Sequence, residues 1–191
     1  MRRKAAWVVG GLAVIAVLVG WSLHGTGFNA RNPPAWIEGR VMLGLRSWAI
    51  PPPAHRLTNP IAPSDAAVRE GMAHWADHCA VCHDNDGSGN VAIGRHLYPP
   101  APDMRLAATQ NLSDGDLFYI IEQGVPYTGM PGWGNGTPEG QESTWHLVLF
   151  IRHLPKLTPE ELKEMTSLNP VSPADQKRKK DIDDFLNGRG H

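Results

Sequence analysis

This sequence has little of what several common protein classes require. Two cysteines among 191 residues provide no framework of disulfides, and a single pair is half of the four-ligand set of a structural zinc site. The chain shows no internal repeat and no convincing strand pattern. The basic run at 177–180 is followed by acidic residues, which is typical of a solvated helix face, so no nucleic-acid partner is predicted. The 20 glycines and 17 prolines indicate a loop-rich protein.

The two cysteines stand together in the pentapeptide Cys79-Ala80-Val81-Cys82-His83. C-x-x-C-H is typical of covalent c-type haem attachment, in which two thiols reach the porphyrin vinyl groups and the histidine reaches the iron. Zinc is one alternative, with His74 and His78 nearby, but adjacent side chains rarely converge on one tetrahedral ion. A thioredoxin-like dithiol is another, and its strand–helix–strand surroundings are not seen here. The favoured prediction is one haem c, bound through Cys79 and Cys82.

The N-terminus has the pattern of a membrane anchor. Residues 2–4 are basic, and residues 5–23 contain no charged side chain. Such a stretch forms a helix of about 28 Å, close to the hydrocarbon thickness of a bilayer. The basic residues before it predict a cytoplasmic N-terminus. The alternative is a cleaved signal peptide, whose apolar stretch is usually shorter and ends at small residues. Both interpretations place the rest of the chain outside the cytoplasm.

The composition divides the chain into segments. Prolines concentrate between the N-terminal stretch and residue 63, which predicts a stiff spacer. The predicted segments are an anchor over residues 1–30, a proline-rich linker over 31–63, a globular domain over 64–168, and a charged tail over 169–191 with the pattern of one more helix. Within the linker, residues 36–49 show a helical apolar pattern, which fits either contact with lipid or packing against the globular domain.

Capping signals mark the helices of the globular domain. Ser64 is a plausible N-cap for a helix that enters the cysteine motif, and Ser113 opens a capping box for a second helix. Thr137 precedes a third helix, which Pro155 stops. Residues 84–112 have turn chemistry and no sustained periodicity. The sequence therefore predicts an all-α domain with long loops.

A second axial ligand would decide between an electron carrier and a catalyst, because a methionine closes the iron site and raises its potential. Of the six methionines, Met104 and Met130 lie in loops of the predicted domain. Met130 stands between Gly129 and Pro131, which let a loop lie flat against a porphyrin, whereas the loop of Met104 should cover the histidine side. The alternative distal ligands are three histidines, His96, His146 and His153.

The motifs Cys79-x-x-Cys82-His83 and Gly129-Met130-Pro131 together resemble the class I c-type cytochromes, especially membrane-tethered bacterial members. The resemblance covers residues 64–155 and includes Gly71-x-x-x-Trp75-x-x-x-Cys79. It implies a class I cytochrome c fold around one covalent haem, preceded here by a single N-terminal transmembrane helix. It also implies His83 as the proximal and Met130 as the distal iron ligand.

The resemblance has further implications for the surroundings of the haem. Trp75 should pack where the first and last helices of the domain cross. A proline carbonyl within residues 98–102 should accept a hydrogen bond from the second ring nitrogen of His83. Candidate donors to the haem propionates are Trp133, Tyr127 and Arg105. The expected location is a bacterial inner membrane, with the haem domain in the periplasm.

Charge is distributed unevenly along the chain. Residues 64–154 have a net charge of −7 and residues 1–63 one of +6. An acidic domain would be steered toward basic docking surfaces of redox partners, although ordinary solubilising charge explains the same count. We expect a membrane-tethered mono-haem cytochrome that carries single electrons between periplasmic or membrane partners and is not an enzyme. The alternatives are a haem c subunit of a dehydrogenase or oxidase, and a haem enzyme or sensor with an exchangeable distal ligand.

Overall fold

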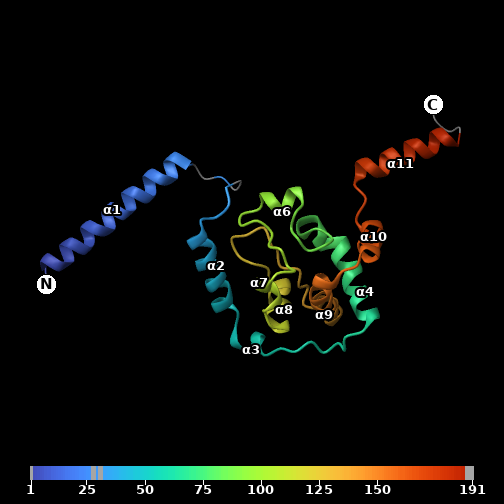
Figure 1. Ribbon diagram of the computed structural model, residues 1–191, viewed down its shortest axis with the longest axis horizontal. Coiled ribbons are helices and arrows are strands. Elements are labelled where there is room, and N and C mark those ends of the chain that lie inside the picture. The colour runs from blue at the N-terminus through green and yellow to red at the C-terminus, as the bar shows by residue number, and fades with distance from the viewer. Residues whose placement is uncertain (1, 27–28, 30–31, 188–191) are drawn as a thin grey trace.

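The computed structural model describes residues 2–26, 29 and 32–187. Over these residues the chain is helical and contains no β-strand, as the sequence predicts. Figure 1 shows a central group of packed helices and loops, from which α1 (Arg2–Thr26) and α11 (Pro173–Leu186) project. Within the described part of the chain, no helix combines the length and the apolar character needed to cross a membrane.

The core is built on the crossing of α4 (Asp65–His74) and α9 (Pro138–His153). The two backbones approach so closely at Gly71 that a Cβ there would collide with the carbonyl oxygen of His146. Trp75 and Phe150 are buried at this crossing, with ring centroids 5.6 Å apart. The expected position of Trp75 between the first and last helices of the domain is therefore confirmed.

Side-chain caps start the helices where the sequence predicts them. Ser64 Oγ accepts a hydrogen bond from Ala67 N (3.1 Å), so α4 begins at the next residue. Ser113 forms a complete capping box at the start of α8 (Asp114–Gln123). Thr137 caps α9, and the short 3₁₀ helix η2 (Leu154–Lys156) follows where Pro155 ends it. Such caps satisfy N–H groups that the first helical turn leaves without partners.

The connection between α4 and α8 contains the shortest helices. The chain leaves α4 through one π-helical turn, η1 (Trp75–Cys79), and continues as α5 (Ala80–His83). After a loop come α6 (Ala92–His96) and α7 (Ala107–Gln110). Behind the crossing, α10 (Pro159–Leu168) returns the chain to the core and buries Met165 completely.

The segment expected to be a spacer packs in part against the globular domain. It contains α2 (Trp36–Ala49) and α3 (Pro52–His55). Ile50 and Ala54 are buried, and α3 lies against α8. Asn59 Nδ2 donates to the carbonyl oxygen of Trp145 in α9 (2.9 Å). Residues 50–61 therefore add to the domain as well as linking to it, which proline content alone does not reveal.

The helix α2 turns polar side chains inward and apolar side chains outward. The Tyr98 hydroxyl donates to Glu38 Oε1 (2.5 Å), and the Arg46 side chain is partly buried. The hydrogen bond joins α2 to the domain, and no residue of α2 is buried. The predicted apolar face faces solvent, with every member about half exposed or more: Ile37, Val41, Leu45 and Trp48.

Candidate cofactor site

The cysteine motif lies where one helix changes its geometry. The π-helical turn η1 ends at Cys79, and α5 carries Cys82 and His83. A π turn holds one residue more than an α turn and is often found at functional sites. The chain then leaves the helix at Asp84, whose φ is 64°. Both thiols are free and half-buried, close to the same helix end as the histidine.

Burial keeps the Cys79 thiol protonated. It raises the pKa of Cys79 to about 12, and the neighbouring Cys82 adds to the shift. A zinc ligand has to be a thiolate, so this environment opposes the zinc alternative. No group of three or more metal-ligating side chains occurs among the described residues. A thioether, by contrast, carries no proton and suits a buried position.

The imidazole of His83 rests on the core. Trp75 donates from Nε1 to the carbonyl oxygen of Asp84 (2.9 Å), and its ring centroid lies 5.6 Å from that of His83. Burial lowers the pKa of His83, so the ring is neutral at neutral pH. Its Nδ1 is buried and has no hydrogen-bond partner within the described chain. The expected proline carbonyl therefore does not accept from it, and the ring keeps the neutral form that a metal ligand needs.

The loop after the motif covers the histidine side of the site. Gly89 N donates to the carbonyl oxygen of His83 (2.8 Å), and Met104 N donates to the carbonyl oxygen of Gly87 (2.8 Å). The Met104 side chain packs against the hydrophobic core. Met104 thus lies on the side where the sequence places it.

The loop that carries Met130 joins α8 to α9 and is fixed to the end of α8. Three backbone hydrogen bonds hold it: Val125 N to Met130 O (3.0 Å), Trp133 N to Ile121 O (2.9 Å) and Gly134 N to Glu122 O (3.0 Å). Gly124 ends α8 with a φ of 70°, and a Cβ there would lie 2.6 Å from the carbonyl carbon of Pro131. Only glycine allows this turn and this approach. The half-buried Met130 is therefore presented on a backbone of defined shape.

Thr128 closes the tip of the same loop. Its Oγ1 donates to the carbonyl oxygen of Val125 (2.8 Å) and accepts from Met130 N (3.1 Å). Beside it, Gly129 lies so close to Leu97 that a Cβ would contact the Leu97 side chain at 2.5 Å. The loop is thereby packed against the segment that follows α6.

Comparison with known families decides what this arrangement is. Residues 66–151 match the family model described as cytochrome C oxidase, cbb3-type, subunit III. This segment is a c-type cytochrome domain. Such a domain implies covalently bound haem c. It supports an electron-transfer role, as an electron carrier or as an oxidase subunit.

The residues present in the cytochrome domain fit a covalent haem. The two free cysteines stand beside a buried, neutral imidazole with an unpartnered nitrogen. Neutral imidazole and thioether sulfur are both ligands that haem iron accepts. Cys79, Cys82 and His83 could hold the group from one helix end, and Met130 could reach it from the loop beyond α8.

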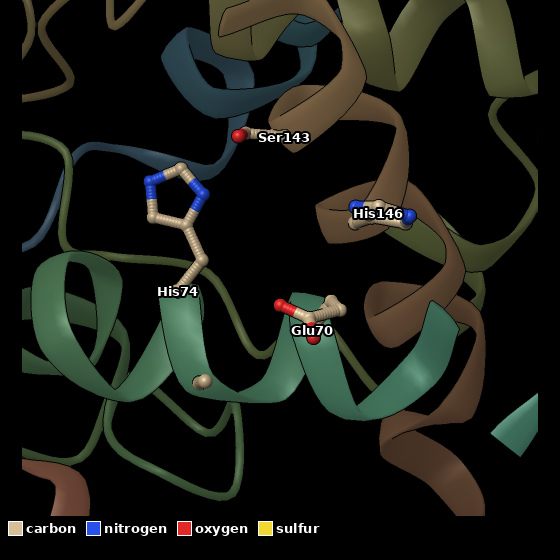
Figure 2. Close-up of a pocket in the computed structure, with 5 residues that line it drawn as sticks. Glu70, His74, Ser143 and His146 are labelled. Atoms are coloured by element: carbon tan, nitrogen blue, oxygen red, sulfur yellow. The ribbon is translucent and has the colours of Figure 1, made fainter. Parts of the chain in front are cut away.

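The three histidines considered as distal ligands have other surroundings. His96 is exposed at the end of α6, and His153 Nε2 bonds Glu161 Oε1 (2.9 Å). His146 lines a hollow between α4 and α9 with Glu70, His74 and Ser143. Figure 2 shows that the His74 and His146 rings in this hollow do not point at a common centre. Nothing in the hollow therefore supports ligation by His146.

The candidate propionate donors are engaged elsewhere or exposed. Arg105 donates to Asp103 from Nε (2.9 Å) and Nη2 (2.7 Å), and to Asp86 from Nη1 (2.8 Å). Tyr127 is 97% exposed. Trp133 meets His78 edge to face, with ring centroids 5.6 Å apart.

The structure draws attention to one residue that the sequence does not single out. Arg46 Nε is buried and has no hydrogen-bond partner among the described residues. The +6 charge of residues 1–63 was the one available signal, and it does not distinguish Arg46 from its neighbours.

Proposed function

We propose that this protein is a membrane-tethered cytochrome with one haem, carrying single electrons between periplasmic or membrane redox partners. Cys79 and Cys82 hold the haem through thioether bonds, and His83 and Met130 ligate its iron. The observation that carries the proposal is the position of the sequence's two cysteines. They flank the end of a helix beside a buried, unpartnered imidazole, inside a segment that matches a cytochrome family.

The bound haem supplies a one-electron iron couple, and the chain sets its surroundings. The buried crossing at Trp75 and Phe150 keeps water from the histidine side. A methionine on the other side leaves no coordination position for a substrate, which favours electron transfer over catalysis. The alternative of an enzyme or sensor requires that position to open.

The assignment of Met130 is tested by two matched substitutions. In the oxidised protein, Met130→Ala should abolish the sulfur-to-iron charge-transfer band, and its reduced form should bind carbon monoxide rapidly. Met104→Ala removes the same side chain from the opposite loop and should keep the band. If the band survives in Met130→Ala, this ligand assignment is wrong. If the unaltered protein lacks the band and binds carbon monoxide rapidly, the enzyme or sensor alternative is correct.

Mass spectrometry of the protein extracted from membranes tests the haem count and the tether together. We expect the mass of the full chain plus one haem. Support for the tether comes from the uncharged residues 5–23 and from the exposed Trp7 and Trp21 near their ends. Domains of this family are typically extracytoplasmic. A protein that lacks its N-terminus, or that an alkaline carbonate wash releases, would contradict membrane attachment through α1.

A second candidate function is a permanent haem c subunit of an oxidase or dehydrogenase complex. The description of the matching family, an oxidase subunit, favours it. In α11, Ile182, Phe185 and Leu186 are exposed. Removing residues 173–191 should release a partner enzyme from the purified cytochrome if this tail holds a complex together. A cytochrome that is purified alone from native membranes with or without the tail would favour the free carrier.

The partner surface is proposed to be basic. Residues 64–154 have a net charge of −7 before the propionates are counted. The rate of electron exchange with a basic partner should therefore fall steeply as ionic strength rises. A rate independent of salt would mean that the acidic residues only aid solubility.

A further inference from the structure

We propose that Arg46 of α2 binds a propionate carboxylate of the haem, so that a helix outside the matched cytochrome segment completes the cofactor site. The inference rests on the haem being bound and is independent of the proposed tether and partners. It assigns a role to the inward face of α2, where Arg46 lies 20 residues before the first residue of the family match.

The first observation is an unpartnered donor. Two side-chain polar atoms among the described residues are buried without a hydrogen bond, Arg46 Nε and His83 Nδ1. A buried donor on a cation is unfavourable unless an acceptor reaches it, and an anion is the best acceptor for a guanidinium. His83 is part of the haem motif, which leaves Arg46 as the buried donor that the motif does not explain.

The second observation is that the nearest acid does not satisfy Arg46. Burial lowers the pKa of the guanidinium, and the charge of Asp116 offsets this only in part. The Asp116 carboxylate is already used, because Oδ1 bonds His55 Nδ1 (2.5 Å) and Oδ2 accepts from Ser113 N (3.0 Å). Arg46 therefore has room for a further carboxylate, which a haem brings with it.

The third observation places α2 beside the Met130 loop. At one end of α2, Glu38 accepts from the hydroxyl of Tyr98, and the preceding Leu97 packs against Gly129. At the other end, Arg46 is close enough to Asp116, in the first turn of α8, for the charge of that carboxylate to raise its pKa. The far end of α8 supports the Met130 loop. One end of α2 is thus joined through residues 97–98 to the Met130 loop.

The other arginines of the domain have hydrogen-bond partners or are exposed. Arg105 binds Asp103 and Asp86, and Arg152 binds Asp114 together with two backbone carbonyls. Arg95 donates to Asn90, and Arg69 is exposed. Arg46 alone among the arginine side chains that the structure describes has a buried donor without an acceptor.

The test compares Arg46→Gln with Arg40→Gln, because both remove one positive charge from the same helix. Arg40 is exposed. Loss of a cation beside the haem favours the oxidised state, so Arg46→Gln should shift the redox equilibrium with a fixed reference couple at least about threefold, or about 28 mV at 59 mV per tenfold change. At physiological salt, Arg40→Gln should shift it less than about 1.5-fold, because exposed charges are screened. The Arg46 shift should persist in 0.5 M salt, roughly three times physiological ionic strength.

Equal shifts for the two glutamine variants, or none for Arg46→Gln, would overturn the proposal. A purely structural Arg46 would lower the unfolding midpoint without moving the potential. Should Arg46→Gln fail to mature, Arg46→Lys keeps the charge but not the planar donor pair. It should move the propionate bending band in resonance Raman spectra, and an unchanged band in this variant would equally reject the contact.

Discussion

The two sides of the proposed haem site are built in different ways. The histidine side belongs to the core. The ring of His83 lies beside Trp75, which in turn contacts Phe150, and both of these residues are at most 2% exposed. The methionine side is a loop, held by backbone hydrogen bonds to the end of α8. The buried core is lost only when the whole domain unfolds, whereas the contacts of a loop can open locally. Damage to the histidine side should therefore unfold the protein, and damage to the methionine side should release one ligand.

The largest effect is expected from Phe150→Ala. Truncating a fully buried phenylalanine costs about 3–5 kcal/mol, a large part of the stability of a small domain. The helical circular dichroism and the haem absorbance should be lost together at a much lower denaturant concentration. Phe185→Ala makes the same change at a position 79% exposed and should have no effect. Loss of the haem spectrum before the helices would contradict the shared core of the histidine side.

A smaller and more local effect is expected from Gly124→Ala. The backbone conformation at this position is nearly restricted to glycine, and placing alanine in it costs about 1–3 kcal/mol. The added Cβ would also push the Met130 loop away. The iron–sulfur band should disappear at a denaturant concentration at which the helices remain.

Gly136→Ala is the matched control for this prediction. Gly136 also has a positive φ, of 74°, but its Cβ would meet no atom within 4 Å. It should lower stability without separating the two transitions. If both variants behave alike, the contact between α8 and the loop does not hold Met130.

The next effect in size concerns Thr128→Val. This change keeps the shape of the side chain but removes an oxygen that makes two hydrogen bonds in the loop. A loss of about 1 kcal/mol should raise the rate at which imidazole replaces the sixth ligand about fivefold. Thr166→Val, at an exposed position of α10, should leave the rate unchanged. An unchanged rate in Thr128→Val would show that this threonine does not limit opening.

The smallest effect should come from Asp103→Asn on the histidine side. The hydrogen bond from Arg105 is the main cause that lowers the pKa of Asp103. A lowered carboxyl pKa stabilises the fold above the ordinary carboxyl range, and this contribution is lost as the pH falls through the folded-state value. At pH 7 the variant should be destabilised by less than about 1 kcal/mol. In urea unfolding, the difference in free energy of unfolding between the variant and the unaltered protein should shrink at acid pH. A difference that grows at acid pH would mean that the assigned direction of the pKa shift is wrong.

Local signals predicted much of the fold. The caps at Ser64, Ser113 and Thr137 start helices as expected, because an N-cap depends only on neighbouring residues. The position of Trp75 at the crossing of the first and last helices of the domain followed from the resemblance to a family. The packing of residues 50–61 did not follow from the sequence, since it depends on surfaces made by α8 and α9.

The site was predictable to the extent that it is local. The C-x-x-C-H motif and the Gly–Met–Pro loop are short patterns, and the structure places them on a helix end and on an anchored turn. The two carboxylate partners of Arg105 were not predictable, because Asp86 and Asp103 lie in a loop without periodicity. Arg46 was missed because burial of one atom depends on tertiary packing. In the same way, α2 turns its polar face toward the domain, whereas an amphipathic helix usually packs its apolar face against the core.

The π-helical turn between Trp75 and Cys79 places five residues in one wide turn between the core tryptophan and the first cysteine. A π turn holds one residue more than an α turn. Deleting Ala76 or Asp77 would leave the residues of an α turn, so the wide turn that places Cys79 beside Trp75 would be lost. Related chains that retain a haem should therefore keep the three-residue interval between this tryptophan and the first cysteine, even where the intervening identities vary.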